Sequence, residues 1–356
     1  MISKPYSNSG VDGASGYEFQ KHCALYIFLE QYEEIKDKKY FICLEHFEDF
    51  LFCYLTEDEL IEKIETYQAK KSSKKWTMNN SEFKNIVKKI LQVGIDLRND
   101  QTLKSPNYFH NLHFLSNCEM SLSKTIKKKK IEDTINERIK INKYNDLKDE
   151  IKNELLTLTD SITKNEIKHL FFKFIDIGKT YKNQELLLIG MFNDIFGEKV
   201  RNHKASVLTL LSLFRDVENT LNQKNIVSLM DKSKRVESEQ INKALNVITT
   251  KQKAFEEWKE KKNIYAPLLK INTMERNNFE LHFENAFDYL KDLKQTEHQK
   301  IFKFVRMIDL TNCYTDEDSL KVIIDNFKLT NSTQFDDLTV KATILASYIQ
   351  IRGDIE

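Results

Sequence analysis

The stretch Ile64–Lys71 constrains the fold most strongly, because polar and apolar residues alternate over Thr66–Lys70 in the way that a β-strand requires. Side chains of a strand point in turn to its two faces, so Thr66, Gln68 and Lys70 share one face. An amide and an ammonium group are therefore expected side by side on this strand.

A second strand-like run, rich in aromatic residues, covers residues 40–55. The same period of two places Glu45 and Asp49 on one face of this run. Pairing the two runs as a hairpin brings Asp49, Gln68 and Lys70 together. A carboxylate, an amide oxygen and an ammonium group are the equipment that a divalent cation and an attacking water require.

The composition favours helix elsewhere, because the 356 residues include only 8 Gly and 3 Pro. The length favours two domains. Five scattered cysteines without a CxxC pair argue against a disulfide framework or a structural zinc site. The apolar runs are too short to span a bilayer and the N-terminus lacks a signal-like apolar core, so the sequence predicts a cytoplasmic protein without a membrane partner.

Charge is distributed unevenly, although the net charge is only +1. Residues 30–66 hold twelve acidic residues against four lysines, whereas residues 67–90 hold seven lysines and one acid. Residues 121–145 are again basic, with eight basic residues against three acids. Carboxylates that hold a metal beside lysines that hold phosphate give such a pattern, and lysine-rich solvated faces are the alternative.

The order of elements predicts an α+β domain followed by an all-α domain. A flexible arm (1–15), a helix from Tyr17 to Ile35, two strands, a helix from Asn79 to Leu97 and a strand over 108–117 give a mixed sheet flanked by helices. The basic stretch 123–130 reads as a connector, and beyond it the pattern is helical, including a helix that starts at 163–166. We therefore expect domains at 1–145 and 146–356, the second serving assembly or partner docking.

Several short motifs resemble those of the double-stranded DNA nuclease domain of bacterial antiphage effectors, a member of the PD-(D/E)xK superfamily. The resemblance spans about residues 10–120 and rests on Gly16–Gln20, Leu44–Asp49, Tyr67–Lys71, Trp76–Thr77 and Phe114–Asn117. Members of this family carry different C-terminal modules. The helical tail here has no phosphate-binding Gly-rich loop and is most similar to the nuclease subunit of Lamassu-type systems, which docks on an SMC-like ATPase complex.

The resemblance implies roles for the clustered residues. Asp49 would be the metal-ligating acid, Gln68 would replace the usual Glu or Asp, and Lys70 would orient the attacking water. An amide oxygen can ligate Mg²⁺ or Mn²⁺ but brings no charge, so the second charge would come from Glu45 or from Glu18 of the first helix.

Neighbouring residues complete this hypothesis. Lys71, Lys74 and Lys75 would contact the DNA backbone, and Trp76 is expected to anchor the core rather than to stack on a base. His110 and His113 are three positions apart on a strand, which points them to opposite faces and argues against a shared metal site.

The sequence thus predicts a Mg²⁺-dependent DNA endonuclease, the effector of an antiphage complex with an SMC-like ATPase and an accessory subunit. We expect it to be latent until it is released or forms a homo-oligomer. One alternative is a non-catalytic DNA-binding or scaffold subunit with a degenerate nuclease fold. Another is a restriction-type enzyme whose helical region reads the target sequence.

Overall fold

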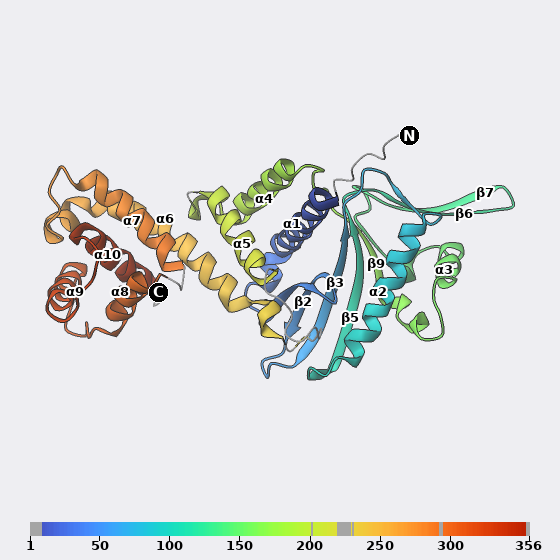
Figure 1. Ribbon diagram of the computed structural model, residues 1–356, viewed down its shortest axis with the longest axis horizontal. Coiled ribbons are helices and arrows are strands. Elements are labelled where there is room, and N and C mark those ends of the chain that lie inside the picture. Colours follow the sequence, from blue (N-terminus) through green and yellow to red (C-terminus); the bar gives the residue numbers. More distant parts are fainter. Residues whose placement is uncertain (1–8, 201, 219–228, 230, 292–294, 354–356) are drawn as a thin grey trace, which may run out of the picture. The chain divides into compact units, whose positions relative to one another are not determined.

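The computed structural model describes residues 9–200, 202–218, 229, 231–291 and 295–353 (Figure 1). The chain forms two compact units, of which the first comprises residues 1–195 and 207–241 and the second residues 196–206 and 242–356. Among the described residues, no helix combines the length and the apolar character needed to cross a bilayer.

The first unit is built on a mixed sheet, as expected. Within the described residues this sheet has seven strands, in the spatial order β10 (Arg235–Glu237), β1 (Tyr40–His46), β2 (Glu48–Leu55), β3 (Ile61–Lys70), β5 (Lys104–Ser116), β9 (Leu170–Phe174) and β8 (Ile141–Lys143). The central strands β3, β5 and β9 run parallel, whereas β1, β2, β8 and β10 add antiparallel edges. The expected hairpin of β2 and β3 is present.

Helices cover both faces of this sheet (Figure 1). α1 packs against β2 and β3, and α2 packs against β5. The helices that begin within residues 1–218 are α1 (Ser9–Ile35), α2 (Ser81–Asn99), α3 (Asp149–Leu156), α4 (Tyr181–Phe196) and α5 (His203–Glu218).

The sequence specifies α2 clearly. The side chain of Asn80 caps its first turn by accepting hydrogen bonds from the backbone amides of Glu82 and Phe83. The buried positions of α2 recur every three or four residues and lie on the sheet. The helix expected from Asn79 to Leu97 is therefore confirmed, with the cap one residue later than predicted.

A smaller sheet contains β4 (Trp76–Thr77), β6 (Met120–Ile126) and β7 (Lys129–Ile135). β6 and β7 pair as a hairpin whose two-residue turn is Lys127–Lys128. The prediction of a connector over residues 123–130 is therefore wrong. The sequence did not indicate the hairpin, because this lysine-rich stretch lacks the Gly and Asn residues that usually mark a tight turn.

The boundary expected at residue 145 also differs from the structure. β8, β9 and β10 lie beyond it and belong to the first sheet, so the first unit continues to residue 241. The helix expected from 163–166 is replaced by two short 3₁₀ turns and strand β9. A short apolar run such as Leu170–Phe174 fits a buried strand as well as a helix, and pairing with β5 decides between them.

The arm expected at the N-terminus is shorter than predicted. α1 begins at Ser9 rather than at Tyr17, and residues 1–8 lie outside the described residues. Gly10, Gly13 and Gly16 lie within this helix, although glycine is a poor helix former.

The second unit is helical, as expected for this part of the chain. Its helices are α6 (Ser238–Leu268), which begins in the first unit, α7 (Arg276–Lys291), α8 (Thr296–Met307), α9 (Asp316–Thr330) and α10 (Asp337–Gly353). α10 is buried along most of its length and packs against α7, α8 and α9. A cluster around Trp258, Phe279 and Phe283 forms the core.

Candidate active site

The pairing of β2 with β3 places Asp49 beside Gln68. Phe50 lies opposite Tyr67 in the register, so the preceding residue of β2 lies opposite the following residue of β3. Directly opposed residues of an antiparallel pair project to the same face. Phe50 and Tyr67 stack with ring centroids 4.8 Å apart, and Asp49 and Gln68 share the other face.

Asp49 is the centre of a compact polar cluster. Its Oδ2 atom accepts a hydrogen bond of 2.8 Å from the backbone N–H of Ala69 and lies 3.6 Å from Nζ of Lys70. The side-chain amides of Gln68 and Gln20 also favour the ionised form of this carboxylate and so act to lower its pKa. The structure therefore brings the predicted trio Asp49, Gln68 and Lys70 together.

Burial controls the electrostatics of the cluster. The side chain of Asp49 is only 12% exposed, and this burial raises the pKa of its carboxyl group, whereas the Lys70 ammonium and the hydrogen bonds act in the opposite direction. The charge of this buried carboxylate is only partly compensated by its neighbours, so a further cation that comes close stabilises its ionised form. The site is thus suited to bind positive charge.

A cavity of about 420 Å³ opens at the Asp49 side of the cluster. Strand residues Glu45, Asp49 and Gln68 line it together with Lys89 and Gln92, which come from α2. The predicted residue Glu45 therefore faces the same cavity as Asp49. Lys89 and Gln92 were missed, because the sequence does not indicate which side of α2 faces the ends of the strands.

The turn between β1 and β2 has a strained backbone beside this cavity. Glu45 has φ 52° and Phe47 has φ 63°, a left-handed conformation that is uncommon for residues with side chains. Such strain persists where the surrounding structure fixes it, often at functional sites. Here it allows Glu45 and Phe47 to line the cavity with Asp49 although the run is not one continuous strand.

A second cavity of about 420 Å³ lies on the Lys70 side. Gln20, Lys70, Lys71 and Lys179 are among its lining residues. Lys179 lies between β9 and α4, far from the other residues in sequence, and was therefore missed. Three lysines in one cavity make it suitable for an anion such as a phosphate.

Glu18 has other partners than the cluster. Its carboxylate lies 3.1 Å from Nζ of Lys21 and 3.0 Å from a guanidinium nitrogen of Arg215. Burial alone would raise the pKa of Glu18, but the hydrogen bonds from Arg215 and Lys21 lower it. Residues two positions apart on a helix point in directions that differ by about 200° around its axis, so Glu18 and Gln20 face opposite ways. Gln20 is the residue of α1 that acts on Asp49.

The predicted DNA-contacting lysines lie on one loop. Lys71, Lys74 and Lys75 are exposed in the segment that joins β3 to β4, and Lys75 lies 3.9 Å from Glu119. Trp76, which follows, is 4% exposed and donates a hydrogen bond of 2.9 Å to Ser116. Its expected role as a core anchor is confirmed.

His110 and His113 project to opposite faces of β5, as predicted. His113 Nε2 pairs with Glu65, whereas His110 Nε2 lies 2.7 Å from Oε2 of the buried Glu166. His169 lies close enough to join His110 and Glu166 in a cluster of possible metal ligands, which the sequence analysis did not anticipate.

Arg98 satisfies this buried cluster without a metal. It donates a hydrogen bond of 2.6 Å to Glu166 Oε1 and lies 3.4 Å from His169 Nε2. Burial would raise the pKa of Glu166, but hydrogen bonds from His110 and Arg98 lower it to about 2, and burial lowers the pKa of His169 to about 4. We interpret the cluster as a structural ion pair that attaches α2 to β5.

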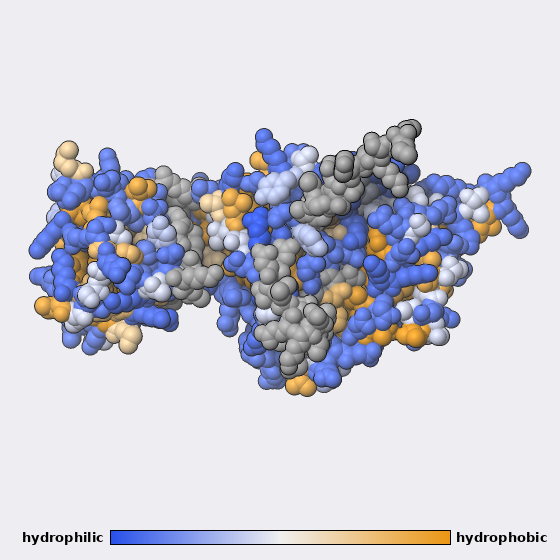
Figure 2. Space-filling view, viewed as in Figure 1, coloured by the Kyte–Doolittle hydropathy of each residue, from blue (hydrophilic) through white to orange (hydrophobic). Residues whose placement is uncertain are grey.

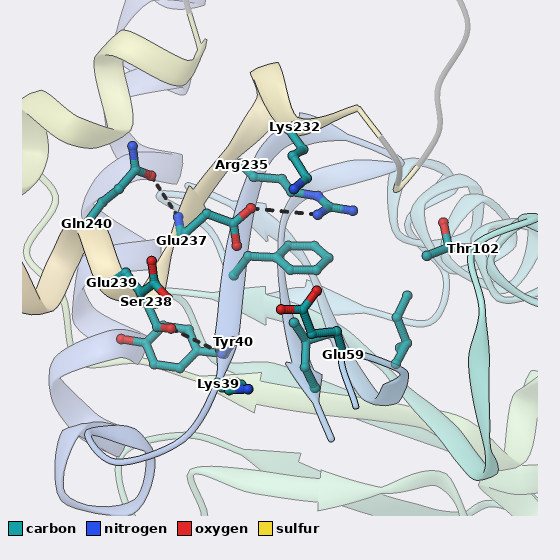
Figure 3. Close-up of a pocket in the computed structure, with 13 residues that line it drawn as sticks. Lys39, Tyr40, Glu59, Thr102, Lys232, Arg235, Glu237, Ser238, Glu239 and Gln240 are labelled. Carbon is teal, nitrogen blue, oxygen red and sulfur yellow. Dashed lines mark hydrogen bonds and ion pairs between the residues drawn. The ribbon is translucent and has the colours of Figure 1, made fainter. Parts of the chain in front are cut away.

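A polar cavity of about 560 Å³ lies at the other end of β1 (Figure 3). Arg235 stacks on the ring of Phe41, 3.9 Å from its centroid, and pairs with Glu237 at 3.7 Å. Besides Arg235, the charged lining residues are Lys39, Lys232, Glu59, Glu237 and Glu239. Its three basic and three acidic lining residues balance, so this cavity has neither the excess of acidic groups of the Asp49 cavity nor the excess of lysines of the Lys70 cavity.

A comparison with protein families decides the class of the first unit. The model of the Cap4 dsDNA endonuclease domain matches residues 8–225, which is more than half of the chain. The chain belongs to this family. The match includes the whole Asp49 cluster and confirms the expected nuclease domain of antiphage effectors. Searches of curated proteins and of solved structures give no significant match.

The Cap4 nuclease match extends well beyond the region on which the resemblance was based. It covers β8 and β9 as well as the helices up to α5, in agreement with the first structural unit rather than with a boundary at residue 145. The nuclease domain therefore includes Glu166 and Lys179.

Proposed function

We propose that this protein is a Mg²⁺-dependent endonuclease of double-stranded DNA that acts in antiphage defence. The observation that carries the proposal is the contact of the Asp49 carboxylate with Gln68 and Lys70 inside a Cap4 nuclease domain. We also propose that the mixed sheet is a PD-(D/E)xK core, in which Asp49, Gln68 and Lys70 take the positions of the signature.

The residues present fit a magnesium ion. Asp49 offers a buried carboxylate, Gln68 an amide oxygen and Glu45 a second carboxylate on the same cavity, and oxygen atoms are the ligands that Mg²⁺ prefers. Bound there, the ion would act as a Lewis acid toward the scissile phosphate. Because Gln68 carries no charge, Asp49 and Glu45 would supply the negative charge between them.

Lys70 is the proposed catalytic residue. It lines the second cavity, and its ammonium group lies 3.6 Å from Asp49, where it can orient the attacking water and stabilise charge that develops on the phosphate. Gln20 would hold the Asp49 carboxylate in place from the side of α1. Lys71, Lys74 and Lys75 would contact phosphates that flank the cleavage point.

We further propose a latent effector of a Lamassu-type complex with an SMC-like ATPase and an accessory subunit. Residues 242–356 of the helical second unit, which lie outside the family match, would dock on these partners in the cytoplasm. Each chain has one Asp49 cluster, so cutting both strands at one point would require a homo-oligomer.

The first test of the proposal is cleavage of plasmid DNA by the purified protein in Mg²⁺, with and without candidate partners. Lys70→Ala and Asp49→Asn should each reduce cleavage by at least about 100-fold, as expected when electrostatic stabilisation of the transition state is lost. Matched controls are Lys38→Ala and Asp58→Asn, which change exposed residues of the same unit and should leave cleavage unchanged. Cleavage by Lys70→Ala at the parent's rate would refute the assignment.

Metal binding supplies a second readout that does not depend on activation. Calorimetric titration with Mn²⁺ should detect a site that Asp49→Asn removes and that Asp58→Asn retains.

The uncharged Gln68 keeps the alternative of a non-catalytic DNA-binding subunit open. That alternative predicts that the protein binds duplex DNA but does not bind Mn²⁺. It also predicts that the protein does not cleave DNA, even when partners are present. A Gln68→Glu variant would then be the informative comparison, because it restores the usual charge of the signature.

A further inference from the structure

The hairpin of β6 and β7 projects from the first unit as a two-stranded ribbon. β4 pairs with β6 only at Met120 and Ser121, and farther out β6 and β7 pair with each other alone as far as Ile126 and Lys129. Figure 1 shows this ribbon extending away from the rest of its unit. We call residues 122–133 the basic ribbon.

The ribbon is rooted in the core and exposed at its end. Met120, Leu122 and Ile135 are fully buried at its base, whereas residues 125–130 are all exposed. The four residue steps from the Leu122 row to the end span about 13 Å at about 3.3 Å each. The projecting end is covered mainly by hydrophilic residues in the view of Figure 2.

The end of the ribbon carries a concentration of positive charge. Lys124 pairs with Glu154 at 2.8 Å and Lys130 with Glu132 at 2.7 Å. For Lys127, Lys128 and Lys129, the described part of the chain provides no ion pair. Three neighbouring ammonium groups therefore project into solvent from a narrow support.

The turn holds two of these lysines in an unfavourable backbone conformation. Lys127 has φ 49° and Lys128 has φ 68°, the conformation of a tight hairpin turn for which Asn-Gly is preferred. A residue with a side chain in this region costs about 1 kcal/mol or more. Stability alone would favour Asn-Gly here, so the lysines are better explained by what their charges bind.

Hydrogen bonds tie the base of the ribbon to the candidate active site. Ser116 Oγ donates to the backbone oxygen of Lys70 at 2.8 Å and accepts from the indole N–H of Trp76 at 2.9 Å. Trp76 begins β4, pairs with Met120 of β6, and its backbone N–H donates to the oxygen of Glu119 at 2.8 Å. The ribbon is thus held at a fixed position relative to Lys70, with the loop of Lys71, Lys74 and Lys75 between them.

We propose that the basic ribbon is a DNA-binding arm, in which Lys127, Lys128 and Lys129 contact phosphates of the duplex beyond the cleavage point. This inference rests on the proposed function for the identity of its ligand. The lysines would form one positively charged track from the site to the end of the ribbon. Contacts to phosphate carry no sequence information, so the arm adds affinity and a fixed orientation without selecting a target.

The test replaces the strained lysines with the residues that the turn prefers. Lys127→Asn combined with Lys128→Gly should keep or raise the urea midpoint of unfolding, so that a loss of binding does not reflect unfolding. Duplex affinity of the full chain is measured by fluorescence anisotropy in EDTA, where no cleavage occurs, over a series of NaCl concentrations. The slope of log K against log salt should fall by about 1.8, since each lost phosphate contact contributes roughly 0.9.

The matched control is Lys38→Gln combined with Lys39→Gln, which removes the same charge at the opposite end of β1 from the site. An unchanged slope in the ribbon variant, or an equal fall of the slope in the control, would overturn the proposal of a DNA-binding arm. A parent chain that binds no duplex would overturn it as well.

Two further outcomes separate this proposal from others. If the slope falls as expected but the parent never cleaves DNA, the ribbon proposal is supported and the nuclease proposal fails. If the ribbon variant instead loses binding only to vesicles that contain anionic lipid, the arm recognises a membrane and the proposal is wrong.

Discussion

Gly94 offers a prediction whose sign depends on the structure. It lies inside α2, where replacing glycine by alanine normally stabilises a helix by about 1 kcal/mol. A Cβ atom at Gly94, however, would lie 2.6 Å from Oε2 of Glu166 and 3.0 Å from Cδ1 of Leu112. Helix propensity and packing therefore predict opposite effects of Gly94→Ala.

The magnitude follows from the surroundings of Glu166. This carboxylate is 1% exposed and is held by His110 at 2.7 Å and by Arg98 at 2.6 Å, so it cannot move aside without losing a buried ion pair. Breaking such a pair costs about 3–5 kcal/mol, and overpacking alone costs about 1–3 kcal/mol. After subtracting the gain in helix propensity, we expect Gly94→Ala to lower the free energy of unfolding of the first unit by about 2 kcal/mol or more.

Urea unfolding followed by fluorescence measures this effect. The chain has two tryptophans, of which Trp76 lies in the first unit and Trp258 in the second, so a Trp258→Phe background reports on the first unit alone. Gly190→Ala is the matched control, because Gly190 lies in α4 with no heavy atom within 4 Å of its built Cβ. The control should become more stable by about 1 kcal/mol.

A rise in stability of Gly94→Ala equal to that of Gly190→Ala would refute this reasoning. A smaller cost of Gly94→Ala in a Glu166→Asp background than in the parent would support it, because the shorter carboxylate leaves room for the methyl group.

Two predictions concern other charged groups of the first unit. The pKa of His169 is about 4 in the folded state, against about 6.5 in the unfolded chain. Between pH 6.5 and pH 4 the unfolded chain therefore binds a proton that the folded chain does not bind, and the free energy of unfolding falls. His169→Gln removes this dependence, so the difference in urea midpoint between variant and parent should shift in favour of the variant as the pH falls, and a constant difference would contradict the assignment. In α1, Gln20→Ala should weaken Mn²⁺ binding at Asp49, whereas Glu18→Gln should leave this binding unchanged. Glu18→Gln should lower the free energy of unfolding by less than about 1 kcal/mol, as for other partly exposed ion pairs. If Glu18→Gln weakened Mn²⁺ binding and Gln20→Ala did not, Glu18 would again be the candidate metal ligand.

The cluster of Asp49, Gln68 and Lys70 could be predicted because it depends on local rules. A period of two on each strand and a hairpin between them determine which side chains meet, and both features are visible in the sequence. The helix capped by Asn80 was predictable for a similar reason, since its cap and apolar spacing lie within twenty residues.

The remaining parts of the first unit depend on distant partners. Leu170–Phe174 becomes a strand because β5 offers it a parallel edge, and nothing within the run itself distinguishes it from a helix. Glu166 meets His110 across 56 residues, and Lys179 reaches the Lys70 cavity from the segment after β9. The ribbon was missed because its turn uses lysines where the backbone prefers asparagine and glycine.

The register of β2 against β3 gives the candidate site its geometry, and the opposite face of the sheet determines that register. Phe50 stacks on Tyr67, and Tyr67 stacks on His113 at 4.5 Å, which connects three strands under α1. A slip of one residue would break this stack and turn Asp49 to the other face. The pairing of His113 with the buried Glu65 opposes a slip of β3 against β5, because a shifted β3 would leave the buried His113 without this partner. The aromatic core on one face therefore positions the polar cluster on the other, and substitutions at Tyr67 or His113 should disturb Asp49 without contacting it.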